Sequence, residues 1–460
     1  MTPTDPGRAG PVHERPVTAA EARARGRALR ETVPRSSHAG WSPPPGRPDP
    51  VTLLEEQNRG RVPELVPIRW GRMLQSPFAF LRGSALVMAT DLASTPATGL
   101  LVQAVGDAHL GNFGTFASPE RTLLFDVNDF DETLRGPWEW DVKRLAVSAV
   151  VAARDAGLPE QAGTGAAREA VRSYRTRLAG YAGLTVLDVW YSRVDASAAS
   201  SLFRRNGLSQ YRRVITAARR RTSQRVLPSL TELTRNGGRR IVDHPPLITH
   251  DALCDDRDEL AAILEGYLDS QSDARRLLLG RFHLEDFARK VVGVGSVGTR
   301  CYIALLVTAA GDPLLLQMKQ EMDSVLSRWW ATGPVPHNGR RVVDGQQVMQ
   351  AASDIFLGWT QGGGIDFSVR QLYDMKGSAV VAAMDGPALA EYMALCGWAL
   401  ARAHARSGDA AAISGYLGTG DAFDQAVTRF AAGYATQTAH DHAALVEAVH
   451  AGRVTAATEA

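Results

Sequence analysis

Three polar side chains in the first third of the chain have types and spacings that suit phosphoryl transfer. Asp107 and Asn112 lie five residues apart, and Asp126 follows fourteen residues later. Apolar, strand-like runs at 100–105 and 123–125 lead into the two carboxylates. We therefore expect both carboxylates at one sheet edge, with Asn112 on the loop between them. Phosphoryl transfer needs a carboxylate that orients and deprotonates a hydroxyl, and oxygen ligands that hold Mg²⁺ against nucleotide phosphates.

The spacing assigns a role to each residue. An Asp, four residues and an Asn, followed by a strand and another Asp, is the spacing of a kinase catalytic loop and its metal-binding aspartate. A divalent-ion site without transfer chemistry and a solvated, turn-rich acidic loop are the alternatives. The predicted catalytic residues are Asp107 as the base and His109 as the residue that orients the loop, and the predicted metal ligands are Asn112, Asp126 and Asp129, with Asp131 in reserve.

The segment Asp-Ala-His-Leu-Gly-Asn at 107–112 resembles the Asp-x-His-x-x-Asn motif of aminoglycoside phosphotransferases and choline kinases more than the His-Arg-Asp motif of protein kinases. The resemblance implies a base and metal ligands at the positions just given. It also implies that Asp141, which precedes a helix, is the structural aspartate of those enzymes. The chain departs from their pattern at Val105, where they usually have a His before Gly-Asp.

A glycine-rich segment about 190 residues after Asp107 has the composition of a phosphate-binding loop. The run VGVGSVG contains G-x-G-x-x-G, and strand-like runs at 301–307 and 314–318 follow it. Glycines let a backbone close over phosphates, and a lysine at the end of the second strand can reach them. A Rossmann loop fits less well because a helix should follow its glycines, and plain hairpin turns are the alternative. The predicted nucleotide-binding residues are Gly293, Gly295, Ser296, Gly298 and Lys319, with Glu321 as a candidate partner of the lysine.

The order of the two motifs is the reverse of the order in kinases, where the glycine loop and the lysine come first. We therefore expect an α/β (α+β) protein with a two-lobed, circularly permuted protein-kinase-like fold. One lobe would be helix-rich and catalytic, and the other would be a smaller antiparallel-sheet lobe. The glutamate that pairs with the kinase lysine has no clear counterpart, because the helix expected at 345–359 offers only Asp354.

Composition divides the chain into four segments. Residues 1–50 carry ten of the 24 prolines and many arginines without apolar periodicity, which predicts a disordered tail. We expect the catalytic lobe at 51–285 and the nucleotide-binding-like lobe at 286–380. Helices at 381–460 are expected to pack back on the catalytic lobe.

The composition and the net charge limit the binding partners and the cellular location that we expect for the protein. The net charge is +2, and the eleven arginines of residues 203–240 lack interleaved aromatic residues, so nucleic acid is not expected as a partner. The three cysteines are far apart, and no apolar run approaches the ~18–20 residues of a membrane span. Because no apolar leader is visible either, we expect a cytoplasmic protein without a membrane partner. The oligomeric state stays open.

Longer phrases of the sequence resemble one family. The combination of GDAHLGNFG, FDVNDFDE, GPWEWDVKRLA, GVGSVGTRCY, MQAASDIFLGW and AHARSGD is similar to the bacterial family called domain of unknown function 2252, from about residue 63 to residue 433. The family name implies no reaction. The residues themselves predict an ATP- and Mg²⁺-dependent transfer of a phosphoryl group to a small-molecule or protein hydroxyl. A metal-dependent phosphohydrolase is one alternative, and a nucleotide-binding pseudokinase or scaffold without turnover is the other.

Overall fold

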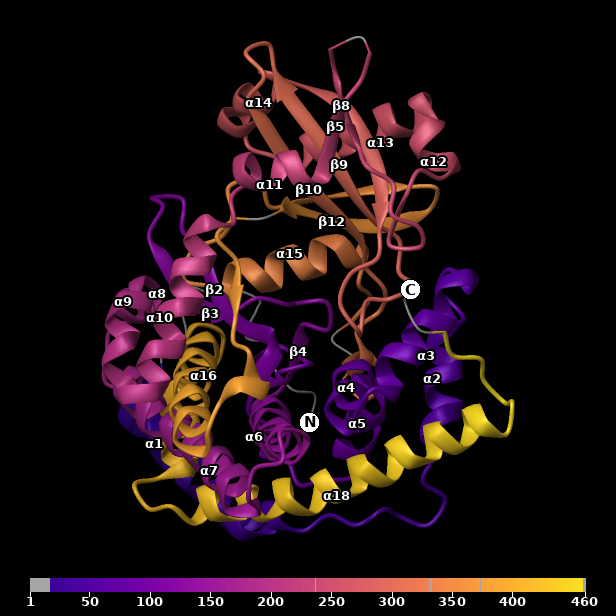
Figure 1. Cartoon of the computed structure of the whole chain (residues 1–460). Helices are drawn as coiled ribbons and strands as arrows, with labels where there is room; N and C mark the ends of the chain where they lie inside the picture. Colours follow the sequence, from indigo (N-terminus) through magenta and orange to yellow (C-terminus); the bar gives the residue numbers. More distant parts are fainter. Residues whose placement is uncertain (1–16, 236, 331–332, 373, 458–460) are drawn as a thin grey trace.

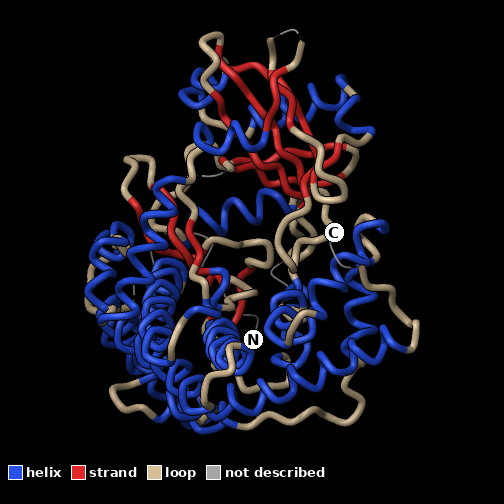
Figure 2. The backbone as a smooth tube through the Cα atoms, in the orientation of Figure 1, coloured by secondary structure: helices blue, strands red, loops and turns tan. Residues whose placement is uncertain are grey.

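The computed structural model describes residues 17–457, apart from 236, 331–332 and 373, and it divides into a helix-rich part and a sheet part (Figure 1). Figure 2 shows the helices gathered in one part and most of the strands in the other. Two separate stretches of the chain build the helix-rich part, and the sheet part lies between them in sequence (Figure 1). The helices of the helix-rich part are α1 (Ala19–Thr32), α2 (Pro50–Asn58), α3 (Val66–Leu74), α4 (Pro77–Gly83), α5 (Ala85–Leu92), α6 (Trp138–Asp155), α7 (Glu160–Tyr181), α8 (Val186–Tyr191), α9 (Ala196–Ala199), α10 (Arg205–Arg220), α16 (Gly386–Ser407), α17 (Ala410–Leu417) and α18 (Ala422–His450).

The helices α6 and α7 form the centre of the helix-rich part. Almost every residue of α6 is buried, as expected for a helix with apolar side chains on all faces. The helix α16 crosses α7 so closely that a Cβ on Gly397 would lie 2.1 Å from the carbonyl oxygen of Ala170. The helix α18 packs against both α6 and α7. This packing fixes α6, whose first turn carries Asp141.

Two small antiparallel sheets carry the first motif. In one of them β1 (Leu101–Ala104) pairs with β4 (Leu134–Pro137). In the other, β2 (Phe113–Ala117) pairs with β3 (Leu123–Val127) and with the short β13 (Gly377–Ser378). The strands that precede Asp107 and contain Asp126 therefore do not share the sheet edge that we expected. The reason is that β2, which begins directly after Asn112, takes the place beside β3.

The sheet part is built around a six-stranded antiparallel sheet in the order β11-β12-β10-β9-β8-β7. Apolar residues of one helix, α13, pack against one face, and those of another, α11, pack against the opposite face. The elements are α11 (Ser223–Leu230), β5 (Thr231–Leu233), β6 (Arg239–Ile241), β7 (Ile248–Thr249), α12 (Ala252–Asp255), α13 (Arg257–Asp269), α14 (Asp273–Leu279), β8 (Phe282–Lys290), β9 (Cys301–Thr308), β10 (Pro313–Gln320), α15 (Asn338–Met349), β11 (Gly358–Gly362) and β12 (Ile365–Gln371). The described chain is thus an α+β protein with antiparallel sheets.

The helix α15 lies between the sheet and the helix-rich part (Figure 1). It packs against β11 and β12 on one side and against α16 on the other. The helix expected at 345–359 is thus displaced toward the N-terminus, since α15 ends at Met349 and β11 begins at Gly358. Asp354 consequently lies in the connection between the two elements and not on the helix.

Residues 17–50 differ from the disordered tail that we expected. The helix α1 has a capping box formed by Thr18 and Glu21, and it packs against α17. Gly26 permits this contact, because a Cβ there would lie 1.9 Å from the carbonyl oxygen of Ala412. Small residues that permit a close approach therefore pack α1 against α17, whereas most helices pack through an apolar stripe. The predicted tail residues 1–16 lie outside the described residues.

The boundary expected at 285/286 falls inside a strand. Residues 282–290 form β8, which pairs with both β7 and β9, so the sheet part begins well before residue 286. The helices α11 to α14 also belong to the sheet part (Figure 1). The polar sequence FHLEDFARK lacks the apolar alternation by which a strand is recognised.

The close packing of α1 on α17 generates a stability prediction. Gly26→Ala is expected to lower the free energy of unfolding by about 1–3 kcal/mol, because the added methyl group must displace a neighbouring backbone. Urea unfolding measures the change. The matched control is Gly165→Ala in α7, where a Cβ meets nothing within 4 Å. Its expected effect is a gain of up to about 1 kcal/mol from helix propensity. Equal effects of the two changes would contradict the tight contact.

Candidate active site

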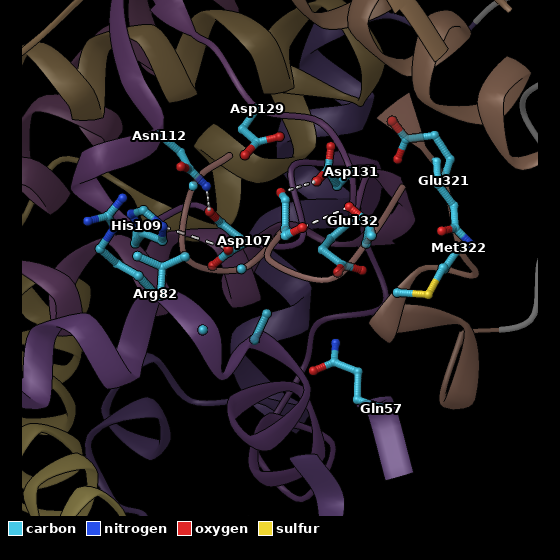
Figure 3. Close-up of a pocket in the computed structure, with 18 of the residues that line it drawn as sticks. Gln57, Arg82, Asp107, His109, Asn112, Asp129, Asp131, Glu132, Glu321 and Met322 are labelled. Carbon is cyan, nitrogen blue, oxygen red and sulfur yellow. Dashed lines mark hydrogen bonds and ion pairs between the residues drawn. The ribbon is translucent and has the colours of Figure 1, made fainter. Parts of the chain in front are cut away.

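A cavity of about 90 Å³ lies where the first motif meets the glycine-rich segment. Six carboxylates line it, and Figure 3 shows those that it labels arranged around a common space. They belong to Asp107, Asp129, Asp131, Glu132, Glu321 and Asp323. Further lining residues are Arg61, Arg82, His109, Asn112, Gly293, Val294, Gly295, Ser296, Thr299 and Met322. Two motifs about 190 residues apart in sequence therefore meet in one pocket.

An arginine from α6 orients Asp107. The guanidinium group of Arg144 lies 2.5 Å from Oδ1 of Asp107. Arg144 is only 2% exposed, and it also donates a hydrogen bond to the carbonyl oxygen of Leu81. The second oxygen, Oδ2, lies 3.7 Å from Nε2 of His109. One oxygen of Asp107 is thus held by the arginine, which leaves the other for a substrate.

A buried aspartate shapes the turn before Asp107. The carboxylate of Asp141 accepts hydrogen bonds from the backbone N–H groups of Val105 (2.7 Å) and Gly106 (3.0 Å). It also lies 3.0 Å from Nε2 of His404, whose Nδ1 meets the hydroxyl of Tyr174 at 2.9 Å. Asp141 therefore fixes the turn that precedes Asp107. Gly106 adopts a φ of +80°, which favours glycine.

His109 and Asn112 stabilise the loop that carries Asp107. Nδ1 of His109 accepts a hydrogen bond from the N–H group of Gly111 at 3.1 Å. Burial lowers the pKa of His109 to about 3, so the ring is neutral and suits the loop-orienting role better than proton transfer. The side-chain amide of Asn112 donates to the carbonyl oxygen of Asp107 at 2.9 Å. That bond uses the amide nitrogen and not the amide oxygen.

Lys319 pairs with the acidic segment that follows β3. It forms an ion pair with Asp131, and its Nζ lies 3.8 Å from Oδ1 of Asp129. Burial, together with the charge of Asp131, raises the pKa of Asp129 to about 6. Burial disfavours the charge on Asp131 as well, but the ammonium group of Lys319 outweighs it and lowers that pKa to about 2. The two carboxyl groups thus titrate as an unequal pair beside one cation.

The glycine-rich segment closes the cavity from the side of the sheet part. Gly293 and Gly298 have φ angles of +66° and +85°, which a residue with a side chain rarely adopts. Ser296 donates from its hydroxyl to Oδ2 of Asp131 at 3.2 Å. Arg72 of α3 donates to the carbonyl oxygen of Gly293, and a Cβ on Gly295 would lie 3.2 Å from the carbonyl oxygen of Arg82. The loop therefore rests directly on the first motif.

Asp126 does not line this cavity, although we predicted it as a metal ligand. It lies within β3, is 1% exposed, and forms an ion pair with Arg402 of α16. Its Oδ2 also accepts a hydrogen bond from the N–H group of Ala351, at 3.2 Å. These contacts join β3 to α16 and to the residues just after α15. Of the predicted ligands, the structure brings Asn112, Asp129 and Asp131 to the cavity, and not Asp126.

Neither candidate partner forms an ion pair with Lys319. Asp354 accepts hydrogen bonds from the backbone N–H groups of Phe356 and Gln371. Glu321 accepts one from the hydroxyl of Ser368 at 2.6 Å. The helix α15 instead contributes Arg341, which donates to the carbonyl oxygen of Asp131 at 2.8 Å. The helix α15 therefore contacts the backbone of Asp131, and the side chain of the same residue forms the ion pair with Lys319.

Sequence reasoning missed three residues that shape the site. Arg144 stands one turn after Asp141 on α6, beside apolar residues on both sides of the helix turn, but Glu139 and Lys143 are charged as well, so the sequence did not single it out. Glu132 follows the acidic run that we used, and it accepts a hydrogen bond from the N–H group of Val325 at 2.7 Å. Arg341 carried no signal, because the carbonyl groups that it contacts become visible only in the fold.

The burial of Glu321 generates a prediction of pH dependence. Burial and the charge of Asp131 raise its pKa from 4.5 to about 8. Between these values the folded protein retains a proton that the unfolded chain has released, so this group's contribution to stability falls as the pH rises. Glu321→Gln should remove that loss. We expect its free energy of unfolding, relative to wild type, to rise between about pH 5 and pH 9 in urea titrations.

The control for this prediction is Glu265→Gln, because Glu265 lies on an exposed face of α13 outside the cavity. The difference in the free energy of unfolding between E265Q and wild type measures the effect of losing a carboxylate elsewhere in the sheet part. If E321Q and wild type differ by the same free energy at every pH, the Glu321 carboxyl is not protonated in the folded protein.

Comparisons with known proteins identify the family. Residues 61–448 match the model of a family described as an uncharacterized protein conserved in bacteria (DUF2252). Neither a curated protein nor a solved structure was found to match the chain. None of the described helices is long and apolar enough to cross a membrane. Because the family model covers most of the chain, the protein belongs to the DUF2252 family of bacterial proteins.

Proposed function

We propose that the protein is a kinase-like phosphotransferase that uses ATP and Mg²⁺ to phosphorylate a hydroxyl group. One observation carries the proposal. Asp107 and Asn112, the aspartates after β3 and the glycine loop line a single cavity, and Lys319 forms an ion pair with one of these aspartates, Asp131. These are the parts that phosphoryl transfer requires, and they come from two stretches of the chain that folding alone brings together.

The order of elements around each motif supports the proposal. The glycine loop joins β8 to β9, Lys319 lies on the following strand β10, and the helix α15 comes next. Kinases place a glycine-rich loop, a lysine-bearing strand and a helix in this order. In the first motif a catalytic loop precedes the β2–β3 hairpin, and Asp129-Phe130-Asp131 follows it, much as Asp-Phe-Gly follows the kinase catalytic loop. The proposed fold is a kinase-like core with its two lobes in permuted order.

Each residue then has a role in the proposed reaction. Asp107, fixed by Arg144, accepts the proton of the attacking hydroxyl, a role typically worth ~10²–10⁴-fold in rate. Lys319 moves from Asp131 to the phosphates when the nucleotide binds. The glycine loop covers the phosphates with its backbone N–H groups. His109 orients the loop without exchanging a proton.

The donor set fits Mg²⁺. Oδ1 of Asp129 is buried without a hydrogen-bond partner among the described residues, and the amide oxygen of Asn112 is an oxygen ligand of the kind that Mg²⁺ prefers. Within the described residues, no group of three His, Cys, Asp or Glu side chains is arranged to hold a metal ion. In kinase sites one or two carboxylates and the substrate phosphates bind the ion together. When bound, Mg²⁺ neutralises charge on the transferring phosphates.

The cavity is smaller than a bound nucleotide requires. Its volume is about 90 Å³, whereas ligand pockets typically measure ~300–1,000 Å³. Binding therefore requires the glycine loop to move away from the first motif. Polar contacts hold the loop at Ser296 with Asp131, at Arg72 with the carbonyl oxygen of Gly293 and at Arg61 with the carbonyl oxygen of Val297. Because the side chain of Val297 also packs in an apolar cluster with Val62, Leu65 and Ile68, the movement is expected at Gly293–Ser296.

A nucleotide-binding protein without turnover is the second candidate. The observation that favours it is the pairing of Lys319 with Asp131 in place of a glutamate from α15. An ion pair that survives nucleotide binding would keep the lysine from the phosphates. A phosphohydrolase, by contrast, would use the acidic motif alone and would not depend on Lys319.

Nucleotide binding is the first prediction of this proposal. ATP with Mg²⁺ should raise the melting temperature of the wild-type protein, by the equivalent of ~2.7 kcal/mol at a hundredfold excess over Kd. Asp129→Asn and Lys319→Met should lose the Mg²⁺-dependent shift. Asp126→Asn is the discriminating control. It should lower the melting temperature without ligand but keep the shift, because Asp126 lies outside the cavity. Loss of the shift in D126N, with retention in D129N, would reverse the two assignments.

Turnover is the second prediction. With a pool of small-molecule alcohols as acceptors, release of ADP by Asp107→Asn should be ~10²–10⁴-fold slower than by the wild type, while its ATP-dependent thermal shift persists. ADP release is followed in a coupled assay. Unchanged turnover in D107N would remove the catalytic assignment. A wild type that binds ATP and Mg²⁺ but releases no ADP would favour the second candidate, and turnover insensitive to Lys319→Met would favour the phosphohydrolase.

A further inference from the structure

A second cavity lies in the helix-rich part, next to the catalytic hairpin. Its volume is about 260 Å³. It is bounded by β2 and β3, by α10 and α16, and by the segment that joins β13 to α16, elements that Figure 1 shows on one side of this part. It shares no lining residue with the cavity that contains Asp107. The two cavities are therefore separate sites, and the inference below does not rest on the proposed function.

The walls of this cavity are almost entirely apolar. Phe203 and Tyr211 stack with their ring centroids 4.4 Å apart, and the rings of Phe125 and Tyr392 complete the aromatic lining. Aliphatic lining comes from Val214, Ala379, Val380, Ala383, Met384 and Ala388. A cavity of ~150 Å³ with such walls stays dry and binds benzene. The present cavity is large enough for about two fused rings by the same comparison.

Two hydroxyl groups in the lining have no partner. The Oγ1 atom of Thr115 and the hydroxyl of Tyr211 are both buried without a hydrogen bond to any described residue. Thr115 is 1% exposed and Tyr211 is 6% exposed. Buried polar groups are almost always paired, because an unpaired one costs desolvation energy with no return. Two unpaired hydroxyls in one apolar cavity therefore indicate a ligand that supplies the missing partner.

We propose that this cavity binds a small, neutral aromatic or alicyclic compound of about two rings that carries one hydroxyl or carbonyl group. The rings occupy the apolar space, and the polar group hydrogen-bonds with Thr115 and Tyr211. A hydroxyl on a protein side chain both donates and accepts, so either an alcohol or a ketone satisfies the pair. A fully apolar compound fills the volume but leaves both hydroxyls unpaired.

The cavity is connected to the catalytic loop through one side chain. The ring of Tyr392 lines the cavity, while its hydroxyl donates to the carbonyl oxygens of Leu110 and Phe113, each at 3.0 Å. These two carbonyls flank Asn112. The occupant of the cavity therefore contacts the side chain that fixes the loop carrying Asp107 and Asn112.

The test compares two probes of equal ring size, 2-naphthol and naphthalene, by equilibrium dialysis with the full chain. Wild-type protein should bind 2-naphthol roughly tenfold more tightly than naphthalene, as expected for one or two added hydrogen bonds. The double variant Thr115→Val, Tyr211→Phe keeps the cavity volume and removes both hydroxyls. It should bind 2-naphthol no more tightly than naphthalene, because the probe's hydroxyl is then buried without a partner. It should melt no lower than wild type, because it loses no internal hydrogen bond.

A second pair of variants tests the location. Val214→Trp places an indole at a half-buried lining position of α10 and should abolish binding of both probes. Its matched control is Ala217→Trp, at an exposed position of the same helix that does not line the cavity, which should bind both probes as wild type does. The proposal is overturned if wild type binds neither probe at its solubility limit. It is equally overturned if folded V214W binds as wild type does, or if the hydroxyl-free double variant retains the preference for 2-naphthol.

Discussion

A buried carboxylate that needs partners fixes the geometry of the candidate active site. Asp141 is 1% exposed, and a charge at such depth persists only when hydrogen bonds compensate it. Its partners are the backbone N–H groups of Val105 and Gly106 on one side and His404 on the other. The turn before Asp107 is thereby fixed to the first turn of α6. Because residues three or four apart share a helix face, the next turn of α6 presents Arg144 to Asp107. The position of the predicted base thus depends on α6, and that of α6 on its packing against α7 and α18.

A second constraint is the excess of acid around the cavity. Burial, together with the charge of Asp131, raises the pKa values of Asp129 and Glu321 to about 6 and about 8, so these carboxyl groups resist ionisation. Lys319 and Arg144 pair with Asp131 and Asp107, and Arg61 and Arg82 also line the cavity, so part of this acid is compensated. Carboxylates without a cation beside them favour added positive charge. Under the proposed function, Mg²⁺ supplies that charge and in turn allows the site to accept the negative phosphates of a nucleotide.

The parts of the candidate site that depend on local sequence patterns could be predicted from the sequence. Asp107, Asn112, the glycine loop and Lys319 were each visible from short spacings beside strand-like runs; the first three line the cavity, and Lys319 pairs with its lining residue Asp131. The choice between Asp126 and Asp129 was not visible, because four carboxylates follow one another in FDVNDFDE. That choice depends on the register of β2 against β3 and on Arg402, a residue 276 positions away along the chain. The folded structure of residues 17–50 could not be predicted for a similar reason, because it depends on the contact of Gly26 with α17 and not on any periodicity.

The described residues show no direct counterpart of the kinase contact between a helix glutamate and the lysine, but α15 and Lys319 are connected indirectly. In kinases an acid on the helix holds the lysine directly. Here the helix α15 contributes a cation, Arg341, which holds the carbonyl oxygens of Asp131 and Thr133. The side chain of Asp131 then holds Lys319. Helix, acidic segment and lysine are therefore still connected, with the acid moved from the helix to the segment. Under the proposed function, a shift of α15 would change the position of Asp131 and, with it, the contact that holds Lys319. Since α15 packs against β12 and also against α16, it connects this contact to both parts of the molecule.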